Sequence, residues 1–356
     1  MSRKFSVLQA NVRKMSEVQH SIMNDDSLEN HSLLLISEPY LFRNQDEEFR
    51  ITPQSHPYWI PFLPKHSKED PRPRAMLWAH KDITARQIPT GSTDIAALLI
   101  EWEKRTLLAI SVYVPEKSDS EDGELHDRLN KIRTVIDTAR RNHENRVELL
   151  IAGDFNRHDQ LWGGDNIATS SRQGEGEPII QFMSELDLQC PLPRGTETWR
   201  SYSGEHHSTI DLILVTQELA SEVQRCATEE TAHGSDHTAI CTEFAIDLVQ
   251  TKSPPRKLWK KTRWDLIKEG VTEELEIRPQ PENPRDVDNY CQYITECIGP
   301  AIEKHVPVAK PSSYMKRWWT ENLTELRKHY TYWRNKARAS RRANMPDSYL
   351  QQMTES

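Results

Sequence analysis

Apolar segments of strand length, separated by short connections, are the feature that most constrains how this chain of 356 residues can fold. Residues 95–102 and 106–114 are both rich in Ile, Val, Leu and Ala, and only three residues separate them. Two strands joined so closely must pair antiparallel, because a parallel crossover needs about a dozen residues or more. We therefore expect mainly antiparallel sheets in the first part of the chain.

The same pattern of β-branched and leucine-rich runs predicts eight strands before residue 247. They are expected at 5–12, 32–37, 75–79, 95–102, 106–114, 147–152, 209–215 and 238–246. A helix is predicted over 124–143 from its apolar periodicity, with weaker helical patterns at 16–24, 178–186 and 217–225. Many strands with few helices favour an α/β (α+β) fold, a four-layer sandwich of two sheets flanked by helices.

Charge and composition change near residue 247. Residues 1–247 hold 26 Lys and Arg against 40 Asp and Glu, whereas residues 248–356 hold 20 against 14. A proline-containing, linker-like stretch begins at 252, and helices are predicted at 286–304 and about 320–343. We expect a first domain over 1–247 and a linker with a largely helical extension over 248–356. An acidic first domain repels phosphate unless bound cations or a basic segment offset its charge.

Five scattered cysteines without a CxxC pair indicate neither a disulfide framework nor a zinc ribbon. They favour a reducing compartment, nuclear or cytoplasmic. No apolar run is long enough to span a bilayer, and the N-terminus lacks the apolar stretch of a signal peptide. No membrane partner is expected, and the oligomeric state stays open.

Polar side chains stand at the ends of several predicted strands. Asp154 and Asn156 follow the apolar strand 147–152, where they could equally be turn formers. Asp211 interrupts an apolar strand, which is costly unless the carboxylate is paired or metal-bound. The set that could converge on one rim is Asn11, Glu38, Asp154, Asn156, Asp211, Asp236 and His237. Hard oxygen ligands without a cysteine cluster favour Mg²⁺, or Mn²⁺, over Zn²⁺.

The order of these residues resembles the endonuclease/exonuclease/phosphatase superfamily, whose members include abasic-site endonucleases and pancreatic deoxyribonuclease. The resemblance runs over residues 5–247 and is carried, in order, by Asn11, Glu38, Tyr113, Asp154-Phe155-Asn156, Asp211 and Ser235-Asp236-His237. It implies a divalent-metal-dependent phosphodiesterase, in which the metal offsets charge on the scissile phosphate.

The resemblance also implies the metal ligands. Glu38 would be a direct ligand, with Asp236 and Asn11 in or near the metal shell. Several relatives have an acidic residue just after the asparagine, whereas here Val12 and Arg13 follow it. One or two bound metals therefore remain open.

The remaining roles also follow from the resemblance. Asp154 and Asn156 would position the attacking water and the phosphate, with Asp154 exchanging a proton. His237 would contact the phosphate and act in proton transfer, oriented by Asp211. Tyr113 would donate a hydrogen bond to a phosphate oxygen.

The substrate-facing surface is assigned to loops. Thr198 would lie near the bound strand, and the loops 61–73 and 194–207 are the candidates for contact with DNA. Target-site preference depends on such loops and on DNA deformability, which one sequence does not display.

The extension adds a second resemblance. Residues 257–264, 302–307 and 317–323, together with 208–212 of the first domain, resemble non-LTR (LINE-type) retrotransposon polyproteins, in which such a segment joins the endonuclease to the reverse transcriptase. No aromatic-Ala-Asp-Asp motif or zinc knuckle occurs, so the polymerase itself is not expected within these residues.

The basic stretch 316–342 has two interpretations. It could bind nucleic acid, such as the element's RNA, through its cations and aromatic rings. Alternatively, Leu323, Leu326, Tyr330 and Trp333 share one helical face that could dock on another domain.

The sequence thus predicts a Mg²⁺-dependent endonuclease that nicks duplex DNA and leaves a 3′-hydroxyl for target-primed reverse transcription. Two alternatives stay open. One is a phosphatase or lipid phosphodiesterase of the same fold, and the other is a non-catalytic nucleic-acid-binding remnant of a retroelement.

Overall fold

A computed structural model describes residues 2–43, 51–65, 71–102, 105–118, 122–143, 146–168, 172–249, 257–275, 284–308 and 320–342. Residue contacts divide the chain into two units. The first comprises residues 1–252 together with 313–356, and the second comprises 253–312. A domain boundary at residue 247 stays a prediction.

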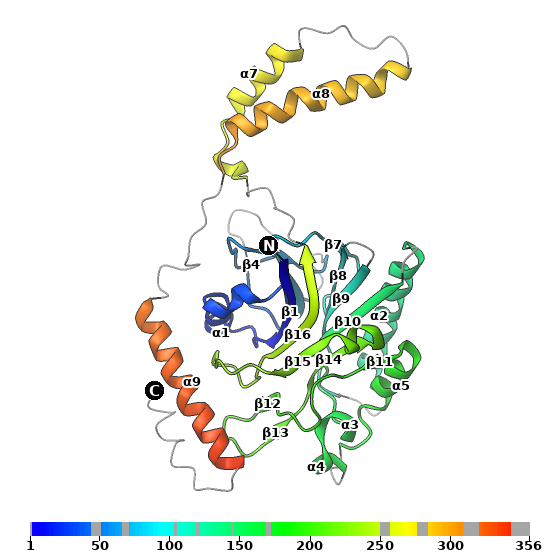
Figure 1. The fold of residues 1–356 in the computed structure, drawn as a ribbon, viewed down its shortest axis with the longest axis vertical. Coiled ribbons are helices and arrows are strands. Elements are labelled where there is room, and N and C mark those ends of the chain that lie inside the picture. Colours follow the sequence, from blue (N-terminus) through cyan, green and yellow to red (C-terminus); the bar gives the residue numbers. More distant parts are fainter. Residues whose placement is uncertain are drawn as a thin grey trace. The chain divides into compact units, whose positions relative to one another are not determined.

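Two six-stranded sheets form the first unit (Figure 1). One has the order β15-β16-β1-β2-β6-β5, with β1 (Ser2–Asn11), β2 (Leu33–Ser37), β5 (Trp59–Phe62), β6 (Ala75–His80), β15 (Val223–Thr228) and β16 (Ile240–Val249). The other has the order β11-β14-β10-β9-β8-β7, with β7 (Ala85–Ile88), β8 (Ile95–Trp102), β9 (Arg105–Tyr113), β10 (Val147–Asp154), β11 (Leu188–Gln189) and β14 (Asp211–Thr216). Two smaller sheets pair β3 (Leu41–Arg43) with β4 (Ile51–Pro53) and β12 (Trp199–Arg200) with β13 (His207–Ser208).

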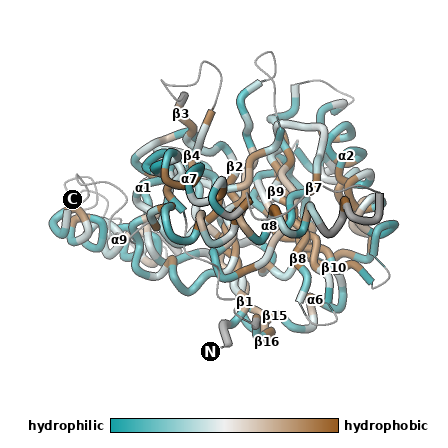
Figure 2. Tube along the Cα trace, turned by 90° about the horizontal axis from the view of Figure 1, so that it is seen from above, coloured by the Kyte–Doolittle hydropathy of each residue, from teal (hydrophilic) through white to brown (hydrophobic). Residues whose placement is uncertain are grey.

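Helices cover the outer faces of both sheets. The helices α1 (Ser16–Met23) and η1 (Asp26–Asn30) pack on the first sheet, and α2 (Gly123–Arg141) and α5 (Glu177–Leu186) pack on the second. The other helices of this unit are α3 (Gln160–Gly163), α4 (Asp165–Ala168), α6 (Gln217–Ser221) and α9 (Glu321–Arg342). One core lies between the sheets, a second between the first sheet and α1, and a third between the second sheet and α2 with α5. Hydrophobic strands accordingly occupy the interior in Figure 2. The predicted four-layer sandwich is confirmed.

Burial on both faces explains the continuous apolar runs that central strands show. In β2, Leu33 and Leu35 face the core between the sheets, while Leu34 and Ile36 pack toward α1.

Each sheet contains one parallel pair among otherwise antiparallel neighbours. β1 pairs with β2 across a connection that contains α1, and β9 pairs with β10 across α2. A parallel pair brings the carboxyl ends of its two strands to the same edge. Asn11 and Ser37 end one pair, and Tyr113 and Asp154 end the other.

The main difference from the predicted elements lies at residues 217–225. The helix ends at Ser221, and Val223–Thr228 forms an edge strand that pairs with β16. Helical periodicity extended through this segment, but the ladder with β16 decides its conformation, since tertiary pairing overrides weak local preference. The loop predicted at 61–73 begins inside β5 and includes residues 66–70, which lie outside the described part.

The second unit is a helical pair. Its helices are α7 (Trp264–Leu275) and α8 (Pro284–His305), preceded by η2 (Trp259–Lys261). A small core joins Ile267 and Val271 of α7 to Ala301 and Ile302 of α8. The predicted helical character of the C-terminal region is confirmed. Among the described helices, none has the length and apolarity needed to cross a membrane.

Candidate active site

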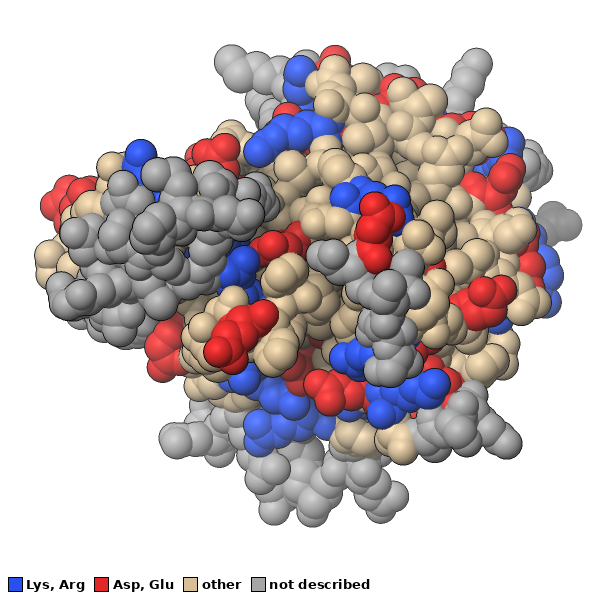
Figure 3. Space-filling model, turned by 90° about the horizontal axis from the view of Figure 1, so that it is seen from below, with Lys and Arg blue, Asp and Glu red and all other residues tan. Residues whose placement is uncertain are grey.

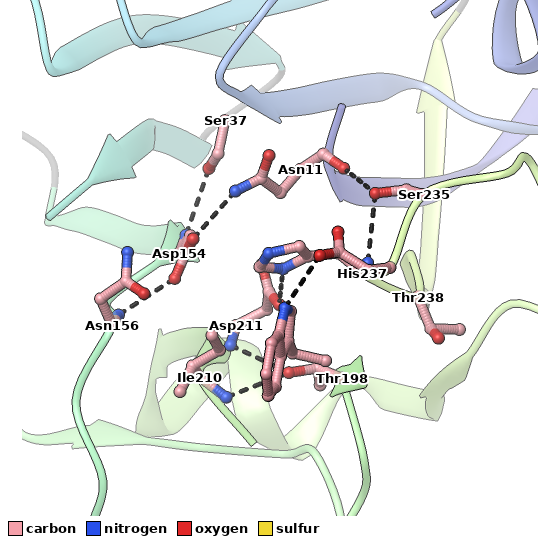
Figure 4. A network of polar contacts seen from close by, with 12 residues as sticks. Asn11, Ser37, Asp154, Asn156, Thr198, Ile210, Asp211, Ser235, His237 and Thr238 are labelled. Carbon is pink, nitrogen blue, oxygen red and sulfur yellow. Dashed lines mark hydrogen bonds and ion pairs between the residues drawn. The ribbon is translucent and has the colours of Figure 1, made fainter. Parts of the chain in front are cut away.

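The predicted polar residues gather where the ends of both sheets meet. Asp154 ends β10 and stands opposite Asp211, the first residue of β14. Asn11 ends β1, and His237 lies just before the antiparallel strand β16. Carboxyl ends of parallel strands and amino ends of their antiparallel neighbours thus share one rim (Figure 4).

A glycine permits the close packing that leads into Asp154. A Cβ atom on Gly153 would lie 1.8 Å from the backbone oxygen of Val112 in β9. No side chain fits at that separation, so this position in β10 requires glycine.

Hydrogen bonds from both sheets fix the Asp154 carboxylate. Asn11 Nδ2 donates to Asp154 Oδ2 at 2.9 Å, and the backbone N–H of Asn156 donates to Asp154 Oδ1 at 3.0 Å. The Asp154 backbone N–H donates to Ser37 Oγ at 3.2 Å, and that hydroxyl donates to the Val112 carbonyl. Ser37, at the end of β2, therefore ties the first sheet to the strand that carries Asp154.

Asp211 connects the rim to the imidazole of His237. Its Oδ2 lies 2.8 Å from His237 Nδ1, and its Oδ1 accepts a hydrogen bond from Gln9 Nε2 at 2.9 Å. Ligand atoms of Asp154, Asp211 and His237 all lie within 4.8 Å of one another, close enough to surround a cation.

Burial and mutual charge set the protonation of this group. Burial, reinforced by the charge of Asp211, raises the pKa of Asp154 to about 8. Burial lowers the pKa of His237, but the charge and hydrogen bond of Asp211 outweigh it and raise that pKa to about 9. The site therefore combines a carboxyl that can hold a proton near neutral pH with an imidazole that favours its cationic form.

Two further predicted carboxylates lie beside cations from one turn. Lys14 Nζ lies 3.0 Å from Glu38 Oε1, and an Arg13 guanidinium nitrogen lies 3.3 Å from Asp236 Oδ2. Trp199 Nε1 also donates to Asp236 Oδ2 at 3.1 Å. These cations partly neutralise the rim.

Strained backbone concentrates here. Arg13, Lys14, Glu38 and Asn156 have φ between 49° and 57°, and they are four of the six described non-glycine residues with positive φ. Such conformations cost of order 1 kcal/mol or more each and persist where the surroundings hold them. Here Lys14 N–H donates to the Glu38 carbonyl at 2.7 Å and Arg13 N–H donates to Asn11 Oδ1 at 2.8 Å.

Tyr113 and Thr198 differ in accessibility. Tyr113, at the end of β9, is partly exposed, and Arg74 stacks on its ring at 4.8 Å. Burial and the nearby charges of Glu38 and Asp154 raise its pKa, so the phenol keeps its proton. Thr198 is fully buried, and its hydroxyl accepts the backbone N–H groups of Ile210 and Asp211 at 3.0 Å. This burial argues against the predicted contact of Thr198 with a bound strand and makes it a support for Asp211.

The structure also gives roles to two residues for which the sequence predicts none. Gln9 is fully buried beneath Asp211, and the Ser235 hydroxyl accepts the His237 backbone N–H while donating to the Asn11 carbonyl. Gln9 precedes Asn11 by two residues, so alternation along β1 places both on one face. That periodicity was the available signal.

The fold of the first unit is shared with known proteins. The solved structures similar to this chain are endonuclease/exonuclease/phosphatase-fold nucleases, and they have the same two-sheet sandwich. A family model described as endonuclease-reverse transcriptase matches residues 107–241. The predicted resemblance is confirmed.

Three solved structures illustrate the likeness. The endonuclease domain of TRAS1, a telomere-specific non-LTR retrotransposon, is 19% identical with a TM-score of 0.53, covering 68% of this chain and 99% of that domain. An AP endonuclease from Leishmania major is 13% identical with a TM-score of 0.53, covering 68% and 88%. A 3′ phosphatase from Neisseria, bound to a product DNA hairpin, is 16% identical with a TM-score of 0.50, covering 67% and 98%. None of the curated proteins matches the chain.

Proposed function

We propose that the first unit is a Mg²⁺-dependent endonuclease that nicks duplex DNA and leaves a 3′-hydroxyl from which reverse transcription can begin. The observation that carries the proposal is the cluster of Asp154, Asp211 and His237 at the junction of the two sheets. The family match and the fold support the coarser statement, a phosphodiester-cleaving enzyme.

The residues of the rim fit a hard divalent cation. Asp236 Oδ1 is buried and has no hydrogen-bond partner among the described residues, an uncommon state for a carboxylate oxygen in a folded protein. Glu38 and Asn11 supply further oxygen atoms at the same rim, and none of the described rim residues is a cysteine. A divalent cation held by these three residues would offset charge on the scissile phosphate and acidify a bound water.

The chain's own groups would complete the chemistry. Asp154, fixed by Asn11 and the Asn156 N–H, would orient the attacking water and exchange a proton with it, because a carboxyl whose pKa lies near neutral pH exists in both protonation states. His237 would bind a phosphate oxygen as an imidazolium held in place by Asp211. Tyr113 would donate its phenolic hydrogen to another phosphate oxygen.

Charge at the surface bears on how DNA approaches. On the face seen in Figure 3, lysine and arginine side chains lie beside aspartate and glutamate instead of forming one basic patch. Few cations of this face would therefore contact phosphate together, so nicking is expected to weaken only gradually with salt. It is also expected to need the divalent cation to offset the acidic rim.

A plasmid assay tests the proposal. The full chain should convert supercoiled plasmid to open circle only with Mg²⁺ or Mn²⁺, and a DNA polymerase should extend the nick. Asp236→Ala and His237→Ala should abolish nicking, while Asp137→Ala, on the exposed side of α2, should not. Nicking that survives Asp236→Ala and His237→Ala would show that the site is wrong. Turnover of a small phosphoester without plasmid nicking would instead favour a phosphatase of the same fold.

A further inference from the structure

Helix α9 contacts the rest of the first unit through a cationic face. Arg327, Thr331, Arg334, Asn335 and Arg338 recur at helical spacing, and each hydrogen bonds to the unit. Because residues 1–247 carry an excess of acidic groups, a helix face rich in arginine is complementary to them. By contrast Leu326, from the apolar face predicted to dock, stays 45% exposed.

The N-terminal half of α9 is anchored beside α1. Arg327 Nη2 lies 3.1 Å from Asp25 Oδ2, and its Nη1 donates to the Ser21 carbonyl at 2.8 Å. Both charged side chains are about nine-tenths buried. A buried ion pair with an added backbone hydrogen bond fixes a helix far better than an exposed pair does.

The C-terminal half of α9 holds the segment that carries Asp236 and His237. Arg334 and Asn335 both donate to the Glu230 carbonyl, at 2.8 and 3.1 Å, and the Ala232 backbone N–H donates to Thr331 Oγ1 at 3.0 Å. Arg338 donates to the side-chain oxygen of Thr238 at 2.7 Å. These contacts bracket residues 230–238 from both ends.

The held segment is continuous with the groups of the site. Thr238 follows His237 directly, and its backbone N–H donates to the Thr198 carbonyl at 2.6 Å. Thr198 in turn accepts the Asp211 N–H. The Arg338 contact is thus one residue from the imidazole and two hydrogen bonds from the carboxylate that orients it.

We infer that α9 is a strap of the nuclease unit that fixes residues 230–238, and that Arg338 is a positioning residue for His237. The effect of Arg338 on catalysis rests on the proposed function, whereas the structural role of α9 as a strap does not. Reacting groups must be held to a fraction of an ångström, so loosening the segment should reduce turnover more than binding.

The test uses the full chain and two readouts. Arg338→Ala should raise amide hydrogen exchange in residues 230–238 by about tenfold or more and lower kcat for plasmid nicking by about 10- to 100-fold, with KM little changed. Arg338→Lys can still donate a hydrogen bond to Thr238, so it should restore most of the exchange protection in residues 230–238 and most of kcat. Arg327→Ala should raise exchange in the same segment, and the charge swap of Arg327→Asp with Asp25→Arg should reverse part of it. Lys328→Ala, on the exposed side of α9, is the matched control.

Each contrary outcome is distinct. Unchanged exchange in both Arg327→Ala and Arg338→Ala overturns the strap. Faster exchange with unchanged kcat overturns the positioning role of Arg338. An equal rise of hydrogen exchange in β9 and β10 also overturns it, because it would mean general destabilisation. A higher KM shared by Arg338→Ala and Lys328→Ala would make α9 a nucleic-acid contact instead. If the unaltered chain does not nick DNA, the proposed function fails, while hydrogen exchange still decides whether the strap exists.

Discussion

Asp211 Oδ2 lies 2.8 Å from Nδ1 of His237, and Asp211 is itself held through its other oxygen by Gln9. The carboxylate therefore fixes both the orientation and the charge of the imidazole. A carboxylate that hydrogen bonds to one ring nitrogen of a histidine commonly orients the other nitrogen for contact with substrate.

Asp211→Asn should lower kcat for nicking by about 10²- to 10⁴-fold, the range that general acid–base groups contribute, with a small effect on KM. The neutral amide keeps the shape but removes the charge that favours the imidazolium. Steady-state nicking rates measure the effect, with Asp137→Asn on the exposed side of α2 as the control. A rate within about threefold of the unaltered chain would rule out this role.

Gln9→Leu should lower the free energy of unfolding by about 1–3 kcal/mol, because Asp211 Oδ1 loses its buried donor. Urea denaturation measures the change. Gln189→Leu, at an exposed position of β11, should have little effect. Equal losses for the two variants would count against the structural role of Gln9.

Lys14→Met should tighten binding of Mn²⁺ by about fivefold, because Lys14 competes for Glu38 and a partly exposed ion pair is worth up to about 1 kcal/mol. Isothermal titration calorimetry on the full chain measures the affinity. Lys4→Met removes the same charge at an exposed site near Gln224 and should leave it unchanged. Weaker binding in Lys14→Met would contradict competition at Glu38.

Arg157→Met should lower the free energy of unfolding by about 3–5 kcal/mol, the cost of breaking a buried ion pair. Arg157 is fully buried, pairs with Asp122 at the start of α2, and donates to the carbonyls of Pro115 and Asn156. Thermal and urea unfolding would report the loss. Arg172→Met, nearly half exposed, is the control and should cost far less.

The first unit should lose stability in acid through His233. Burial, together with the charges of Arg327 and Arg334, outweighs Asp25 and lowers the pKa of His233 to about 3. The unfolded chain therefore takes up a proton near pH 6.5 that the folded chain refuses, and stability falls as pH drops below that value. Between pH 6.5 and 5 the loss should reach about 2 kcal/mol. His233→Gln, compared with the unaltered chain by urea unfolding at both pH values, should remove most of this difference. An undiminished difference would place the acid sensitivity elsewhere.

The layers of the fold could be predicted because the strands are long, apolar and closely spaced. The eight predicted strands are the inner strands of the two large sheets. The edge strands β5, β7, β11 and β15 are short or half-exposed and carry weaker patterns. The strand at Val223–Thr228 was missed for this reason.

The site divides in a similar way. Asp154 and Asp211 could be noticed because a carboxylate beside an apolar strand needs an explanation. The burial of Arg157 and the contact of Arg327 with Asp25 could not be predicted from the sequence. Each depends on a partner from a distant part of the chain. Thr198 shows the converse, because a hydroxyl near the motif was assigned to substrate although its burial makes it a support.

The hydrogen bonds at the rim join residues that are far apart along the chain. Asn11 and Asp154 are separated by 143 positions, and Gln9 and Asp211 by 202. Contacts of such long range form late in folding, because closing the intervening loops costs entropy before any contact repays it. A nascent, misfolded or proteolytically opened chain should therefore lack the assembled rim, so that the proposed cleavage of a phosphodiester would require both sheets to be packed against each other.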